Sequence, residues 1–80
     1  MKAPTYHASG GVIFQREHAA MTLERAYSIK ATHQFNASFW LSQGTIPAAK
    51  RLEMAEAEQA LADEMAAAIA EITQPMERAA

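Results

Sequence analysis

The stretch Tyr27–Phe39, YSIKATHQFNASF, decides the fold because it fits two kinds of secondary structure. Every odd position is apolar, aromatic or His, and every even position is polar. This two-residue alternation predicts half-buried strands, with one face on a core and the other in water. Apolar side chains also recur every four residues from Leu23 to Phe39, which is typical of a helix. The Thr, Ser and Asn content of the stretch favours the strands.

The surrounding sequence extends this interpretation to an α+β fold. Gly10-Gly11 precedes the β-branched and aromatic run VIFQR, which predicts a strand. We therefore expect a small antiparallel sheet of two or three strands over about 11–42, after an irregular lead-in over 1–9. The alternative is an all-α helical hairpin, in which residues 20–43 are helical.

A long amphipathic helix is expected over about 46–73. It follows the boundary SQGTIP, where Thr45 can cap the helix and Pro47 suits its first turn. Pro75 is expected to end it, leaving 74–80 as a frayed tail. Its apolar face must be buried, and we expect four of its residues to pack between two copies of the chain: Leu61, Met65, Ala68 and Ile72.

Length and composition limit the protein further. Its 80 residues form a single domain, 1–80, whose core is marginal without extra burial. No Cys is present, so disulfides and thiol chemistry are excluded, and we expect a homo-oligomer, most simply a dimer. The N-terminus predicts no signal peptide, and no apolar run predicts a membrane span. We expect a cytoplasmic protein.

Catalysis and metal binding are not predicted. His7, His18 and His33 lack carboxylates at ligand spacing, apart from the adjacent Glu17-His18. No Ser lies in a sharp strand-to-helix turn, and no phosphate-binding glycine motif follows Gly10-Gly11. We therefore expect no enzyme, no catalytic residue, no cofactor and no metal.

The charge pattern predicts binding to a macromolecule. Residues 1–52 carry six basic and two acidic side chains, whereas residues 53–80 carry one basic and seven acidic side chains. A line of carboxylates on the long helix could engage a basic partner. The polar face of the expected sheet is a second candidate surface. The acidic helix row comprises Glu53, Glu56, Asp63, Glu64 and Glu71, and the sheet face offers Lys30, Gln34, Asn36 and Trp40.

Two resemblances suggest what the partner is. In size, Cys-free composition and Ala-rich acidic character, the chain looks like the small host-takeover proteins of bacteriophages, such as anti-CRISPR inhibitors. This resemblance implies a non-enzymatic inhibitor that blocks or bridges a host protein. The segment PAAKRLEMAEAEQAL resembles the last helix of double-stranded RNA-binding domains over about fifteen residues. That likeness implies the alternative, a nucleic-acid- or nucleotide-binding regulator that uses Lys30, Lys50 and Arg51.

Overall fold

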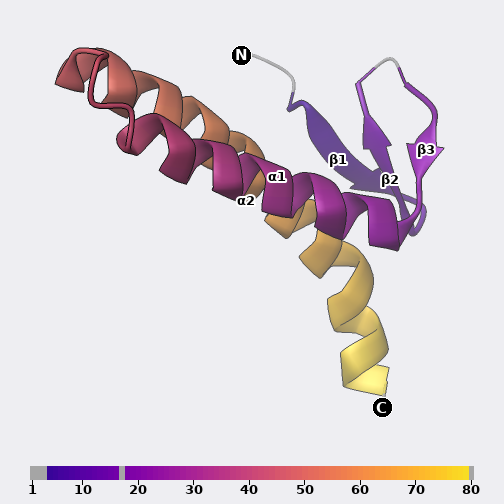
Figure 1. The fold of residues 1–80 in the computed structure, drawn as a ribbon. Helices are drawn as coiled ribbons and strands as arrows, with labels where there is room; N and C mark the ends of the chain where they lie inside the picture. Colours follow the sequence, from indigo (N-terminus) through magenta and orange to yellow (C-terminus); the bar gives the residue numbers. More distant parts are fainter. Residues whose placement is uncertain (1–3, 17, 80) are drawn as a thin grey trace.

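The computed structural model describes residues 4–16 and 18–79, with side chains as far as Gln74. Figure 1 shows a small antiparallel sheet followed by two helices. The expected α+β class, the three-stranded antiparallel sheet and the long C-terminal helix are confirmed. The elements in chain order are β1 (Tyr6–Ser9), β2 (Val12–Gln15), β3 (Ala20–Met21), α1 (Leu23–Leu41) and α2 (Ala48–Ala79).

The sheet is built on a tight hairpin. Strand β2 pairs with β1 on one side and β3 on the other, and Ser9 lies opposite Val12. Gly10 and Gly11 connect β1 to β2 with φ angles of 59° and 80°. A two-residue hairpin turn with positive φ at both positions suits the twist of the strands and favours glycine. The irregular lead-in expected over 1–9 is therefore wrong for residues 6–9, which become a strand by pairing with β2.

The segment Leu23–Leu41 is a helix, so the strands expected there are wrong. Thr22 begins the helix, since its hydroxyl oxygen accepts a hydrogen bond from the backbone N–H of Arg25 at 3.1 Å. Buried Ala26 and Ala37 present little bulk toward the core. The residues assigned to a sheet face consequently lie on α1: Lys30, Gln34, Asn36 and Trp40.

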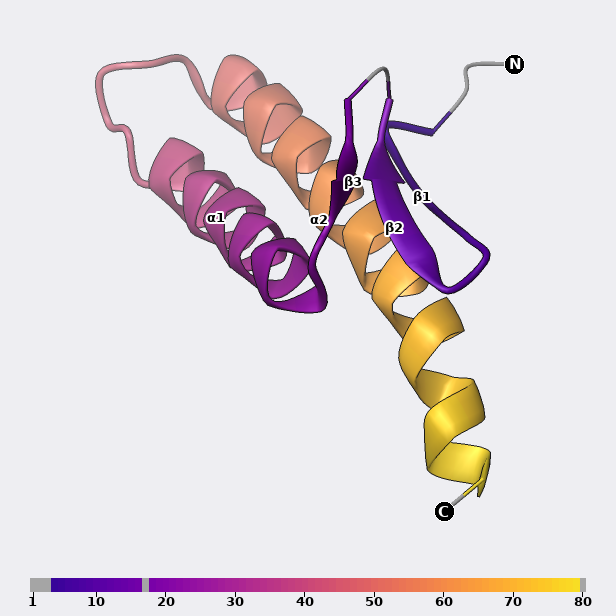
Figure 2. The ribbon, with the colours of Figure 1, turned by 90° about the vertical axis from the view of Figure 1, so that its right-hand side faces the viewer.

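Helix α2 runs antiparallel to α1, passes the sheet and projects beyond both at its C-terminal end (Figures 1 and 2). Its 32 residues correspond to a length of about 48 Å, which matches the longest dimension of the molecule, 48 Å. The helix begins at Ala48 rather than at 46 and continues through Pro75 to Ala79. A proline removes its own N–H from the helical ladder, and here it does not end the helix.

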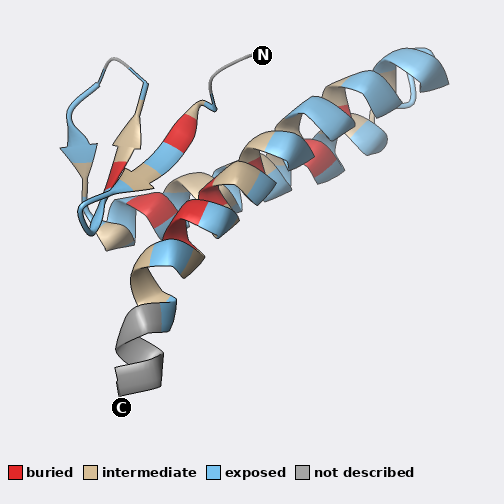
Figure 3. Ribbon diagram, turned by 180° about the vertical axis from the view of Figure 1, so that it is seen from behind, coloured by how far each residue is buried: buried red, intermediate tan, exposed pale blue. Residues whose placement is uncertain are grey.

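The core lies where the sheet, α1 and the middle of α2 meet (Figure 3). Ile13 and Met65 are the large side chains that are fully buried. The four residues expected to pack between protomers lie within this core instead, because the sheet and α1 cover that side of α2. Met65 and Ala68 belong to the buried cluster, and Leu61 and Ile72 are partly buried against it. Neither helix, over its described residues, is long and apolar enough to cross a bilayer.

Candidate functional site

The outer side of α1 displays aromatic side chains to solvent. Tyr27, Phe35 and Phe39 retain 48%, 69% and 47% of their accessible surface. With exposed Ala31 they are spaced four residues apart, so they form one stripe about 18 Å long on the helix. We call Tyr27, Ala31, Phe35 and Phe39 the aromatic face. It is a contiguous apolar surface, unlike the single exposed apolar residues that are normal on any protein.

Formal charge is confined to one end of the aromatic face, where Glu24 and Lys30 lie three residues from Tyr27 on the helix. Residues 31–49, which form the second half of α1, the loop and the first two residues of α2, contain no Asp, Glu, Lys or Arg. Leu41 and Leu52 are each 52% exposed and lie at the hairpin end of the two helices. Protein interfaces are enriched in aromatic residues and depleted of charge at their centres. The composition of this surface is therefore that of an interface core.

The inner side of α1 is built differently from the outer side. Ala26 and Ala37 are 0% and 7% exposed, and the aliphatic side chains of Leu23 and Ile29 pack against the core beside them. Phe35, the most exposed of the large apolar residues on the described surface, is turned away from it. The internal packing of the chain thus gives no reason for large aromatic residues on the outer side.

A hydrogen-bond chain joins β1, α1 and α2 through His33. The imidazole Nδ1 lies 2.6 Å from Oε2 of Glu58, and Nε2 lies 2.8 Å from the hydroxyl of Tyr6. An ionised carboxylate only accepts hydrogen bonds, so Nδ1–H donates to Glu58, and in the neutral imidazole Nε2 then accepts from the Tyr6 hydroxyl. These two hydrogen bonds hold Tyr6 of β1, His33 of α1 and Glu58 of α2 together.

The hydrogen bonds from Glu58 through His33 to Tyr6 resemble a catalytic relay in their connectivity. The Tyr6 hydroxyl at their end is, however, poorly placed for chemistry. Tyr6 is 6% exposed. Burial raises the pKa of Tyr6 above its ordinary value, and the negative charges of Glu58 and Glu64 raise it further. A nucleophile or base would need a depressed pKa and access to substrate. The arrangement suits a structural bond between elements.

The expected acidic row is divided between exposed and structural carboxylates. Glu64 is half-buried, and its Oε1 accepts hydrogen bonds from the backbone N–H groups of Thr5 at 2.6 Å and Tyr6 at 3.2 Å. It therefore anchors the start of β1 to α2. The remaining members of the row are exposed on α2: Glu53, Glu56, Asp63 and Glu71.

The basic residues of the nucleic-acid alternative do not form one surface. Lys30 is half-buried near the middle of α1, whereas Lys50 and Arg51 lie at the start of α2. Lys50 forms an exposed ion pair with Glu53 at 3.7 Å. The guanidinium Nη1 of Arg51 donates to the carbonyl of Leu41 at 3.2 Å, where α1 has no basic residue in its own last turn. A cation at a helix C-terminus is stabilising, so Arg51 has a structural role.

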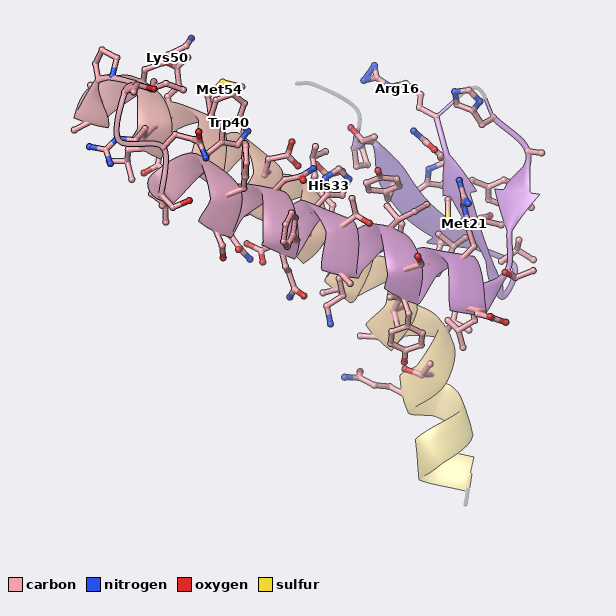
Figure 4. The ribbon with its side chains drawn as sticks, in the orientation of Figure 1. Arg16, Met21, His33, Trp40, Lys50 and Met54 are labelled. Carbon is pink, nitrogen blue, oxygen red and sulfur yellow. The ribbon has the colours of Figure 1, made fainter. Side chains whose placement is uncertain are left out.

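The residues that the sequence predicted on a sheet face are dispersed around α1. Gln34 is exposed, and Lys30, Asn36 and Trp40 are half-buried. Figure 4 draws Trp40 at the hairpin end of α1, the end at which Lys50 and Met54 of α2 also lie. Its ring meets that of Phe39 edge to face, with centroids 6.0 Å apart. Trp40 thus supports one end of the aromatic face.

The described surface also contains open grooves between α1 and the sheet. Two adjoining grooves of about 480 Å³ and 320 Å³ lie between α1 and the sheet and share Gln15, Arg25 and Ile29. Within residues 4–16 and 18–74, no three His, Asp or Glu side chains are grouped so that they could hold a metal ion.

The aromatic face is not among the sites expected from the sequence. Its signal is the four-residue apolar spacing from Leu23 to Phe39, which indicates a helix, whereas the two-residue alternation of the same segment indicates strands. Comparison with known proteins adds no assignment: no protein family, no curated protein and no solved structure matches the chain.

Proposed function

We propose that this chain is a non-enzymatic binding protein that contacts a protein partner through the aromatic face of α1 and so blocks or bridges that partner. The observation that carries the proposal is the 69% exposure of Phe35 at the centre of an uncharged helix surface. Large exposed apolar patches on small proteins mark interaction sites.

The exposed aromatics supply a large part of the free energy that specific binding needs. Aromatic side chains bury about 150–250 Å² each, so covering the exposed half or more of three of them removes roughly 300 Å² from water. At about 25 cal/mol per Å² this is worth roughly 7–8 kcal/mol. Loss of translational and rotational freedom on association costs about 4–15 kcal/mol, which can exceed this gain. Contacts at Leu41 and Leu52 are therefore also needed.

The chemistry of the surface supports a protein partner over a nucleic acid. Phosphate backbones are held by Lys and Arg, and residues 31–49 offer neither. Arg51 is engaged at the C-terminus of α1. A phage-type inhibitor of a host system is the narrower form of the proposal and is supported by size and composition alone. A cytoplasmic location belongs to the same proposal and is supported by the Cys-free sequence.

The test is capture of a partner by matched variants. Tagged wild-type chain, Phe35→Ser and Val12→Ser are each incubated with bacterial lysate, and bound proteins are identified by mass spectrometry. Val12 is exposed on β2, so its variant makes an equivalent apolar-to-polar change outside the aromatic face. We expect a protein captured by the wild type and by Val12→Ser and lost with Phe35→Ser. Capture that Phe35→Ser leaves unchanged contradicts the proposal.

A further inference from the structure

We propose that the aromatic face is occupied by a second copy of this chain, in a two-fold dimer whose α1 helices pack antiparallel. The inference rests on the proposed function, since both require the aromatic face to be a protein-binding surface. Because the second copy covers the aromatic face, a protein captured from lysate binds the dimer as a whole, and Phe35→Ser loses it by dissociating the dimer. The proposed contact through α1 replaces the expected contact through α2, because the apolar residues of α2 are already covered within the same copy.

The accessible surface is too large for a compact monomer. The chain exposes 5691 Å², whereas a folded monomer of 8.7 kDa exposes about 4,700 Å². The excess of roughly 1,000 Å² compares with about 800 Å² buried by each partner in a standard interface. The radius of gyration agrees, at 14.6 Å against about 12 Å for a compact domain of this length. The chain is elongated, 48 × 28 × 20 Å, and the end of α2 projects past the sheet, so a second copy on α1 would bury the part of this excess that lies on α1.

The aromatic face is complementary to itself in shape. An antiparallel pairing with the two-fold axis at the level of residue 33 brings Phe35 opposite the partner's Ala31, and Ala31 opposite the partner's Phe35. A large side chain thus meets a small one twice. The same axis brings Tyr27 opposite the partner's Phe39, an aromatic pair of the kind that interfaces favour. In a two-fold interface each contact occurs twice, so one favourable pairing is doubled.

Charge also favours a second copy at this face. The antiparallel pairing sets the first half of each α1, with Glu24, Arg25 and Lys30, against the uncharged second half of its partner, so like charges do not meet. The exposed carboxylates of α2 would repel themselves in a symmetric contact, which disfavours α2 as the interface. In the proposed dimer Glu53, Glu56 and Asp63 remain exposed on both copies. The dimer therefore presents two equal acidic surfaces, as bridging requires.

The experiment is a size-swap at the paired positions, with mass measured by light scattering over micromolar concentrations. The wild type is expected at twice the 8.7 kDa chain mass. Phe35→Ala leaves a gap, and Ala31→Phe sets two large side chains against each other, so each single variant is expected to weaken dimerisation about 30-fold or more, as at interface hot spots. The double variant Ala31→Phe/Phe35→Ala restores a large side chain opposite a small one, and its dimer is expected to recover to within about tenfold of the wild type.

The outcomes separate this inference from the proposed function. A monomeric wild type, or a dimer that the single variants do not weaken, overturns the dimer proposal, and so does a double variant no better than the singles. The lysate capture experiment is read independently: loss of a captured protein with Phe35→Ser in a monomeric chain leaves the proposed function standing. Circular dichroism of each variant confirms folding, and Val12→Ser is the control that should keep the wild-type mass.

Discussion

Replacing Tyr6 by Phe removes one hydroxyl from the hydrogen-bond chain that joins β1, α1 and α2. The ring is 6% exposed, and Phe fills the same space, so no cavity forms. The variant loses the 2.8 Å hydrogen bond between the Tyr6 hydroxyl and Nε2 of His33. That nitrogen is then left half-buried without a hydrogen-bond donor. Losing a hydrogen bond and leaving one partner unpaired costs about 1–2 kcal/mol of stability.

This loss is large on the scale of so small a domain. An 80-residue protein has a free energy of unfolding of about 4–12 kcal/mol. A change of about 1–2 kcal/mol lowers Tm by roughly 4–16 °C. It lowers the urea midpoint by about 0.5–2 M, since the slope of a small protein is about 1–2 kcal/mol/M. Urea unfolding followed by far-UV circular dichroism measures it.

Tyr27→Phe is the matched control. The same hydroxyl is removed from a side chain that is 48% exposed, so the change in stability should stay within about 0.5 kcal/mol. If Tyr6→Phe and Tyr27→Phe unfold at the same urea concentration, the chain through His33 does not stabilise the fold, and the reasoning from its short distances is refuted.

The pH dependence gives a second readout of the same hydroxyl. Burial, with the charges of Glu58 and Glu64, raises the pKa of Tyr6 above 10.0 in the folded protein. Above pH 10 the unfolded chain therefore loses a proton that the folded chain retains, so stability is full below that pH and falls as pH rises through the folded pKa. Tyr6→Phe should show a shallower alkaline loss than the wild type.

Three further predictions concern the fold. Met65→Ala empties the centre of the core, where Met65 is 0% exposed, and should cost about 2–5 kcal/mol in urea unfolding. Thr22→Ala removes the N-cap of α1 and should cost about 1 kcal/mol, measured in the same way, whereas Thr22→Ser should retain most of it. Gly11→Ala forces a side chain into the left-handed region at φ 80° and should lower Tm by several degrees, because that conformation costs about 1 kcal/mol for a residue other than glycine.

Local signals predicted the elements that depend on local chemistry. The strand Val12–Gln15, which Gly10-Gly11 precedes, and the helix after Pro47 are marked by residues whose own backbone preferences specify them. Strand β1 carries no such mark. Tyr6–Ser9 becomes a strand because β2 supplies its hydrogen bonds and Glu64 fixes its first residues, and neither contact is visible in four residues of sequence.

The roles of the charged residues were harder to predict because several of them are engaged by residues distant in the sequence. The exposure of Glu53, Glu56 and Asp63 follows from their positions around an amphipathic helix, and the structure places them on the surface. Glu64 and Glu58 are taken up by β1 and by His33, across separations of 58 and 25 residues. Arg51 is likewise engaged by the end of α1. Composition alone does not distinguish these engaged side chains from free surface charges.

The misassigned segment and the proposed interface have one cause. A helix that buries one side concentrates its apolar residues at spacings of three and four, and polar residues fill the rest. Helix α1 instead has apolar residues on opposite sides, with Ala26 and Ala37 toward the core and Tyr27, Phe35 and Phe39 toward solvent. Apolar positions distributed around a helix can coincide with every second residue, which is why this segment imitates a strand. A strand-like alternation within a helix is therefore what a second apolar contact would produce, and the swap of Ala31 and Phe35 tests for that contact directly.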